Sequence, residues 1–339
     1  MKILSIRPNE KAVATYRQTR MLSTLGAKFR KELLRKNENI QIGELAKRFK
    51  KLGDIWQIKY IEDRHTLDVL YTMRNAVGAK VVIDIDDNVW QMPLRNIAIF
   101  KKNGLGDYMS HSRRCINLIE SIKAADWVTV STEPLKNKLK TINQNIVTLP
   151  NLIDPKEWKF KRKKHNKIRI GWIYSPTHIP DIDVVKDAIK EIYKKYQDKI
   201  EIVVFGTTID IFDEVPITKI QGVDFKDYPK LLTEAGIDIS ICPLEDNEFN
   251  KCKSNIKWLE STLAGACVVA SKVYPYETSI KDGKTGYLAK GKSQWIKKIS
   301  YLIESEAKRN EMTSNALKEV LEYDFRKDTK WKLFYEAIS

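Results

Sequence analysis

The clearest alternation of apolar and polar positions in this chain runs from Ile237 to Ser271. Apolar residues first alternate with polar ones up to Pro243, which predicts a short strand that ends there. The polar and acidic stretch 244–252 follows and predicts an exposed loop. Apolar residues then recur at helical spacing, and the apolar run 267–270 predicts a buried strand. We therefore expect this stretch to fold as strand, loop, helix and strand.

Short apolar runs alternate with amphipathic helical patterns through the rest of the chain. Strands are expected at 1–6, 55–61, 80–87, 127–130, 145–149, 168–173, 201–206 and 217–223. Strands that alternate with helices in this way predict parallel sheets of the α/β class. The length of 339 residues allows two domains of ordinary size.

The helix expected after the 244–252 loop places three charged side chains on one face. Lys253, Lys257 and Glu260 are spaced i, i+4 and i+7. Ser254 or Asn255 is the expected N-cap, and a helix N-terminus beside two lysines suits a phosphate. A carboxylate one or two turns further along can accept hydrogen bonds from a ribose diol. The alternative is a solvated helix face that carries an i, i+3 Lys–Glu pair.

Two segments around this helix resemble a known family motif. SNIKWLESTLAGACVVAS and YPYETSIKDGKTGYLAK resemble the donor-nucleotide motif of retaining glycosyltransferases with the GT-B fold, group 1 or family 4-like. Glu260 matches the second Glu of that family's E-x7-E motif, and the first would fall at Cys252. Glu248 or a main-chain N–H is the candidate substitute for the missing acidic contact to the donor sugar. The family's D-G-x-x-G-x-L turn is matched by Asp282, Gly283, Gly286 and Leu288.

The resemblance implies an α/β protein of the GT-B fold, with two Rossmann-like domains that face each other across a cleft. Residues 1–155 would form the acceptor-side domain, 156–167 a basic linker, and 168–325 the domain that binds a nucleotide-sugar. A final helix, expected within 326–339, would return to the first domain. The helix start at 14–20 and the segment YSPTH resemble a subgroup of the family found in bacteria and phages.

Donor-side candidates follow the strands of the second domain. YSPTH offers Ser175, Thr177 and His178 at a place where many relatives carry an Arg and a Lys for the diphosphate. Hydroxyls and main-chain N–H groups can hold phosphate oxygens there, and His178 either donates to phosphate or caps the next helix. Gly206 ends a strand where a base or a ribose can approach the backbone closely. The expected donor site comprises Ser175, Thr177, His178, Gly206, Lys253, Ser254, Asn255, Lys257 and Glu260.

Acceptor-side candidates are expected in the first domain. In the family that the chain resembles, the loop after the first strand reaches the acceptor, and here that loop leads to Tyr16, Arg17 and Arg20. The alternative for the two arginines is a surface helix. We therefore assign these three residues to acceptor binding.

A cluster of carboxylates, Asp84, Asp86 and Asp87, ends the apolar run at 80–87. The carboxyl end of a parallel strand is where α/β proteins place their sites. Asp86 or Asp87 stands where the family often has a His, so we expect these two as catalytic residues facing the sugar and the acceptor hydroxyl. The alternative is that the cluster caps a loop or holds Arg17 or Arg20.

Neither metal ligands nor membrane spans are indicated. The D-x-D spacing of Asp84 and Asp86 is also a metal motif of GT-A enzymes, but the donor motif is of GT-B type, for which no metal is required. The four cysteines form no C-x-x-C pair, which indicates a reducing cytoplasm, the host cytoplasm if the chain is phage-encoded. No apolar run approaches the ~20 residues of a membrane span, and no secretory signal is recognised at the N-terminus.

The charge balance suggests a polyanionic partner. Lys and Arg number 60 against 44 Asp and Glu, a net charge of +16. Nucleic acid, an anionic membrane surface or an acidic glycan would suit this excess, and the alternative is a lysine-rich composition without such a partner. The segment 27–52 is especially basic. Candidate phosphate contacts are Arg30, Lys31, Lys50, Lys51, Lys101, Lys102, Arg162 and Lys163.

Taken together, these features predict a retaining glycosyltransferase that uses a nucleotide-sugar, a UDP-sugar being the expected donor. The first hypothesis for the acceptor is a hydroxymethylated pyrimidine in phage DNA. A second enzyme hypothesis is transfer to a cell-envelope glycan or a protein near an anionic membrane. The alternative without catalysis is a GT-B-like protein that binds nucleotide or nucleic acid.

Overall fold

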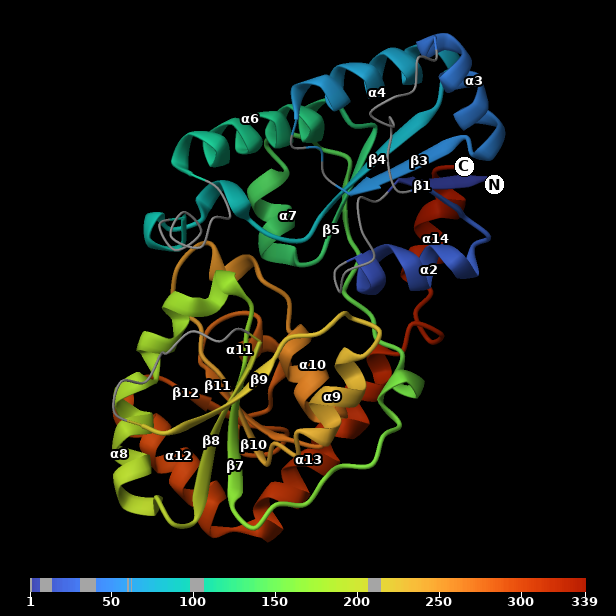
Figure 1. Ribbon diagram of the computed structural model, residues 1–339. Helices are drawn as coiled ribbons and strands as arrows, with labels where there is room; N and C mark the ends of the chain where they lie inside the picture. The colour runs from blue at the N-terminus through green and yellow to red at the C-terminus, as the bar shows by residue number, and fades with distance from the viewer. Residues whose placement is uncertain are drawn as a thin grey trace.

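A computed structural model describes residues 2–6, 14–30, 41–59, 61, 63–97, 107–206 and 215–339. Two sheets of six parallel strands lie at the two ends of an elongated molecule, each flanked by helices (Figure 1). The α/β class and the GT-B arrangement of two Rossmann-like domains are therefore confirmed. Residues 31–40 of the expected basic segment lie outside the described residues, as do Lys101 and Lys102.

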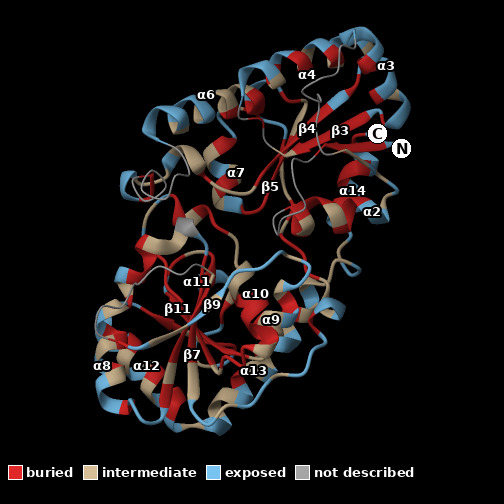
Figure 2. Cartoon of the chain, in the orientation of Figure 1, coloured by how far each residue is buried: buried red, intermediate tan, exposed pale blue. Residues whose placement is uncertain are grey.

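The first sheet has the strand order β2-β1-β3-β4-β5-β6. Its strands are β1 (Ile3–Ile6), β2 (Lys28–Arg30), β3 (Ile55–Lys59), β4 (Lys80–Ile85), β5 (Trp127–Val130) and β6 (Ile146–Thr148). The helices are α2 (Arg20–Thr24), which continues a π-helical turn at Thr15–Thr19, α3 (Ile42–Leu52), α4 (Arg64–Val77), α6 (Tyr108–Ala124) and α7 (Glu133–Leu139). The central strands are buried on both faces (Figure 2), which explains why most of their residues are apolar.

The second sheet has the strand order β12-β11-β10-β7-β8-β9. Its strands are β7 (Ile168–Ile173), β8 (Ile200–Gly206), β9 (Ile217–Gln221), β10 (Ile239–Cys242), β11 (Cys267–Ser271) and β12 (Tyr287–Ala289). The helices are α8 (Lys186–Tyr196), α9 (Tyr228–Glu234), α10 (Ile256–Leu263), α11 (Tyr276–Ser279), α12 (Lys292–Glu304) and α13 (Glu306–Val320). The expected strand, loop, helix and strand of 237–271 are β10, a loop ending in a 3-10 turn at Asn250–Cys252, α10 and β11.

Helix α14 (Lys330–Ala337) packs on the first domain, although it follows the second sheet in the sequence (Figure 1). Its buried Trp331, Phe334 and Tyr335 share one apolar cluster with Ile3 and Val82 of the first sheet. The hydroxyl of Tyr335 also donates to the amide oxygen of Gln57, which is buried in β3. The expected return of the final helix to the first domain is confirmed.

The chain crosses between the two domains twice, and the crossings lie side by side. Ile153 pairs with Asp324 as an isolated parallel bridge. The N–H of Ile153 donates to the carbonyl of Tyr323 at 3.0 Å, and the N–H of Phe325 donates to the carbonyl of Ile153 at 3.0 Å. The second crossing leads on to α14. The two crossings therefore form one hydrogen-bonded connection beside the space that separates the two sheets.

Candidate active site

A cavity of about 220 Å³ opens between the two domains. The carboxyl ends of β4 and β7 and the start of α10 meet there, as expected for a ligand site in parallel α/β sheets. The first domain contributes Tyr16, Asp86, Asp87 and Asn151 to its lining. The second domain contributes Ser175, His178, Lys253, Ser254, Ile256, Lys257, Glu260 and Tyr276.

The carboxylate of Glu260 is the most heavily bonded group in the cavity. Only 2% of the residue is exposed. Its Oε1 accepts from the Tyr16 hydroxyl at 2.7 Å, and its Oε2 accepts from the Tyr228 hydroxyl at 2.8 Å and from Lys257 Nζ at 2.9 Å. Burial and the Glu260 carboxylate raise the pKa of both tyrosines, which keeps them as donors. Tyr16 belongs to the first domain, so this bond joins the two domains across the cavity.

Lys253 connects the second domain to the carboxylate cluster of the first. Its Nζ lies 3.4 Å from Asp87 Oδ1 and 4.3 Å from the centroid of the Phe249 ring. Burial raises the pKa of the Asp87 carboxyl, and the ammonium of Lys253 opposes that rise. The neighbouring Asp86 also lines the cavity, and its buried Oδ1 forms no hydrogen bond with a described residue but lies 3.8 Å from Lys59 Nζ, at the limit of an ion pair.

The loop after β7 brings His178 to the cavity in a fixed orientation. Its Nδ1 lies 3.0 Å from Asp181 Oδ2, and Asp181 also accepts from the N–H of Glu245 and the side-chain amide of Asn250. Burial and Lys253 lower the pKa of His178, so the ring is neutral at pH 7. Ser175 lines the same wall, whereas the side chain of Thr177 lies outside the described residues.

Ser254, Asn255 and Gly206 support the site from its edges. Ser254 lines the cavity and accepts from the side-chain amide of Asn151 at 2.8 Å. Asn255 stands at the N-cap position of α10 but its amide donates to Ser279 and Tyr323 instead of capping the helix. Gly206 ends β8 with a φ of 138°, and a Cβ there would lie 2.3 Å from the carbonyl oxygen of Tyr174. Neither Asn255 nor Gly206 lines the cavity.

Arg17 and Arg20 are turned into the protein, which corrects their expected contact with an acceptor. Arg17 is fully buried and forms a bidentate ion pair with Asp84, at 2.6 and 2.8 Å. A third contact, from its Nη1 to the Leu149 carbonyl at 2.6 Å, occupies the rest of the guanidinium. Arg20 donates to the Leu152 carbonyl and to Glu157. The alternative interpretation was that the carboxylate cluster holds Arg17, and Asp84 does hold it.

Cys252 and Glu248 do not supply an acid to this cavity. Cys252 is buried in the apolar core of the first domain, and burial raises the pKa of its thiol to about 11. Glu248 pairs with Lys138 and Lys251 in a separate cavity. Among the described residues, the carboxylates that line the active-site cavity are Asp86, Asp87 and Glu260.

Four residues of the site were not predicted from the sequence: Asn151, Tyr228, Ile256 and Tyr276. Tyr228 and Tyr276 approach from α9 and α11, and no spacing in the sequence connects them with α10. Asn151 follows β6, and no spacing in the sequence connects it with Ser254, to which its amide donates. In the described parts of the chain, no three His, Cys, Asp or Glu side chains gather as metal ligands would.

Comparison with known proteins identifies the class of protein. Residues 156–319, just under half of the chain, match the family model "Glycosyl transferases group 1". None of the curated proteins matches the sequence. This match covers the second domain, and the whole chain has the two-domain GT-B fold. Together these two findings identify the chain as a glycosyltransferase.

Solved structures share the fold at low sequence identity. HepE from Anabaena, solved with UDP-glucose, has a TM-score of 0.64 and 12% identity over 99% of this chain and 100% of HepE. Sucrose-phosphate synthase from Thermosynechococcus elongatus has a TM-score of 0.64 and 10% identity over 100% and 99% of the two chains. A variant of S. aureus TarM, solved with fondaparinux, α-GlcNAc-glycerol and UDP, has a TM-score of 0.57 and 17% identity over 86% of this chain and 58% of TarM.

Helices long and apolar enough to cross a bilayer do not occur in the described ranges.

Proposed function

We propose that the protein transfers a sugar from a UDP-sugar to an acceptor hydroxyl with retention of the anomeric configuration. The observation that supports this most directly is the group formed by Lys253, Lys257 and Glu260 at the start of α10, inside the interdomain cavity. The departing diphosphate gains negative charge in the transition state, and the two ammonium groups would stabilise it. The HepE structure, which contains UDP-glucose, supports the choice of donor.

Each remaining group of the cavity has a defined part in this proposal. Glu260 would accept from the ribose diol after Tyr16 releases its Oε1. The carboxylate of Asp86 would accept from a hydroxyl of the donor sugar or the acceptor. Asp87 would lie beside the reacting centre with its charge balanced by Lys253. His178 and Ser175 would position the phosphates from the β7 side.

For the acceptor we propose a polyanion, and in particular DNA with a hydroxymethylated pyrimidine. The net charge of +16 supports this, and the exposed Lys51 of α3 has no carboxylate partner among the described residues. Other candidate phosphate contacts are engaged with carboxylates: Lys50 with Asp54, Arg162 with Asp238 and Lys163 with Glu234. A ligand phosphate would have to compete with these pairs.

The function is tested with a panel of UDP-sugars and acceptors. We expect one of the UDP-sugars to give UDP release. We also expect an α-configured donor to give an α-configured product, as determined by NMR of the product. If DNA is the acceptor, a patch of about four phosphate contacts predicts a loss of affinity on the order of 10² between 50 and 200 mM salt. Extrusion of the base costs a few kcal/mol, so single-stranded DNA should bind at least as well as duplex.

Transfer to a glycan with no binding to DNA at low salt would reject the DNA proposal and leave the sugar-transfer proposal standing. Absence of UDP release with every donor and acceptor would contradict sugar transfer itself. Binding of UDP without transfer would then favour the non-catalytic alternative.

Turnover is expected to continue in excess chelator. The two lysines can supply the positive charge that a divalent cation provides in D-x-D enzymes, and Asp84 of the D-x-D pair is occupied by Arg17. The measurement is UDP release before and after EDTA treatment, with manganese or magnesium added back. Loss of activity on chelation and recovery on addition of the metal would contradict this prediction.

A further inference from the structure

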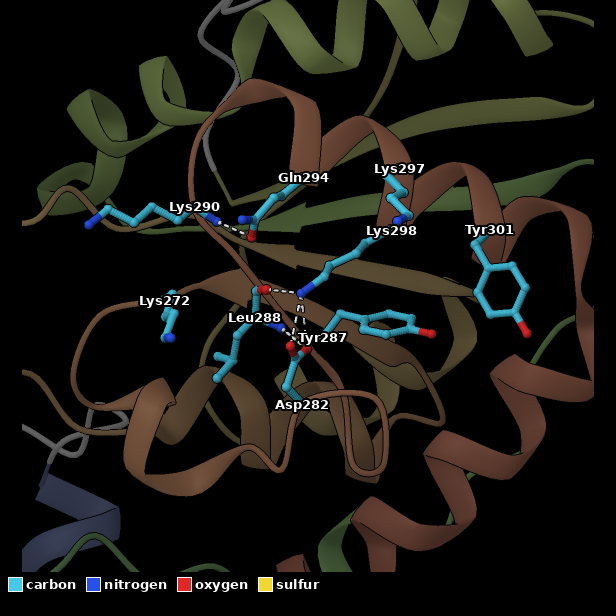
Figure 3. A pocket seen from close by; sticks show the side chains of 9 residues that line it. All are labelled: Lys272, Asp282, Tyr287, Leu288, Lys290, Gln294, Lys297, Lys298 and Tyr301. Atoms are coloured by element: carbon cyan, nitrogen blue, oxygen red, sulfur yellow. Dashed lines mark hydrogen bonds and ion pairs between the residues drawn. The ribbon is translucent and has the colours of Figure 1, made fainter.

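A second cavity lies at the β12 edge of the second sheet, beside α12 (Figure 3). Its volume is about 620 Å³, and it shares no lining residue with the interdomain cavity. Gln294, Lys297, Lys298 and Tyr301 line it from one face of α12, since they are spaced i, i+3, i+4 and i+7. The proposed sugar transfer assigns no contact to this cavity, although Asp282 and Leu288 of the D-G-x-x-G-x-L turn lie in its lining.

The walls of this second cavity carry a positive charge that the protein does not balance. Asp282 is the single acidic residue of the lining, and Lys298 Nζ approaches its two carboxylate oxygens at 3.1 and 3.0 Å. Lys290 and Lys297 have no side-chain hydrogen bond or ion pair with any described residue. Lys272 also lines the cavity and lies 3.9 Å from the half-exposed Glu277, at the limit of an ion pair. An anion would therefore gain charge-assisted contacts without displacing a protein carboxylate.

Aromatic and amide groups stand next to these lysines. The rings of Tyr287 and Tyr301 meet edge to face with centroids 6.5 Å apart, and 49% of Tyr301 is exposed. Gln294 Oε1 accepts from the backbone N–H of Lys290, which leaves its NH₂ group free to donate. A tyrosine ring beside a free amide suits a ring that has an apolar face and hydroxyl groups, as a sugar does.

We propose that this second cavity binds a phosphate ester of a sugar. Lys297 attracts the phosphate, and Tyr301, one helical turn further along α12, packs against the sugar ring. Figure 3 shows Tyr301 at one end of the cavity and Lys272 and Lys290 at the other, with Lys297 and Lys298 between them. The ligand is either a nucleotide or a simple sugar phosphate, since both contain a phosphate group attached to a sugar ring.

The test is a calorimetric titration of the full chain with ribose 5-phosphate, inorganic phosphate and ribose. We expect ribose 5-phosphate to bind more tightly than the other two. Lys297→Glu should weaken its binding about tenfold or more, as loss of a charge-assisted contact does. Tyr301→Ala should weaken the binding of ribose 5-phosphate but not of inorganic phosphate. Tighter binding of adenosine monophosphate than of ribose 5-phosphate would identify the ligand as a nucleotide, and equal binding as a sugar phosphate.

Two control variants distinguish binding in this second cavity from binding elsewhere on the protein. Lys318→Glu on the exposed side of α13 introduces the same charge change outside the cavity and should leave binding unchanged. Lys257→Ala alters the interdomain cavity, which by the proposed function also holds a ribose and phosphates, and the binding that Lys297→Glu weakens should persist in it. Absence of saturable binding, equal loss in Lys318→Glu, complete loss in Lys257→Ala, or equal affinity for inorganic phosphate would overturn the proposal. Because UDP release is measured separately, failure here leaves the proposed sugar transfer untouched.

Discussion

Replacing Glu260 with Gln is expected to lower kcat/KM for the UDP-sugar on the order of 10²-fold. The carboxylate accepts three hydrogen bonds from protein groups, and in the proposed complex it accepts from the ribose. Each hydrogen bond to a charged group contributes about 1.5–3 kcal/mol, so the loss of charge at this position affects both donor binding and the position of Lys257. Lys257→Ala should also lower turnover, because it removes the ammonium group that stabilises the negative charge of the departing diphosphate.

The measurement for both variants is UDP affinity together with steady-state transfer, with circular dichroism to confirm folding. Glu311→Gln serves as a matched control, because Glu311 is an exposed carboxylate of the same domain that pairs with Lys308 on α13. Unchanged UDP affinity and turnover in Glu260→Gln and Lys257→Ala would refute the assignment of the donor site.

Asp84→Leu is expected to reduce the free energy of unfolding by about 3–5 kcal/mol, since it leaves the guanidinium of Arg17 buried without a counter-charge. Both side chains are fully buried, and Thr129 Oγ1 donates to the same carboxylate at 2.6 Å. The loss should appear as a lower urea midpoint in equilibrium unfolding.

Two comparisons make this result specific to the buried pair. The double variant Arg17→Met/Asp84→Leu should recover much of the loss, because it removes both charges. Asp54→Ala, which breaks the exposed pair with Lys50, should cost about 0–1 kcal/mol. If Asp84→Leu were no more destabilising than Asp54→Ala, the structural role assigned to the buried pair would be wrong.

The apolar runs of the sequence predicted the central strands because a parallel sheet is buried on both faces. They missed β2 and β12, which stand at the sheet edges and, at three residues each, are too short for an apolar run to stand out. Helix α10 and its charged face were predictable from local spacing. The bond between Tyr16 and Glu260 was not, because the two residues are 244 positions apart and meet only through the packing of two domains.

The carboxylate cluster shows a second kind of limit. Asp84, Asp86 and Asp87 are alike in the sequence, yet Asp84 is buried in an ion pair while the other two line the cavity. Which of them faces a ligand depends on the arginine that reaches the strand from another helix. The local sequence therefore predicted where the carboxylates lie. It did not predict which of them is buried in an ion pair and which line the cavity.

The return of α14 has a consequence for the order in which the protein acquires its structure during synthesis. Residues 168–320, which make the second sheet and its helices, are synthesised before Trp331, Phe334 and Tyr335. The first domain is synthesised earlier but lacks those three side chains until then, so part of its apolar cluster stays exposed to water. The first domain can therefore be completed only after the second domain has been synthesised, when α14 covers that surface.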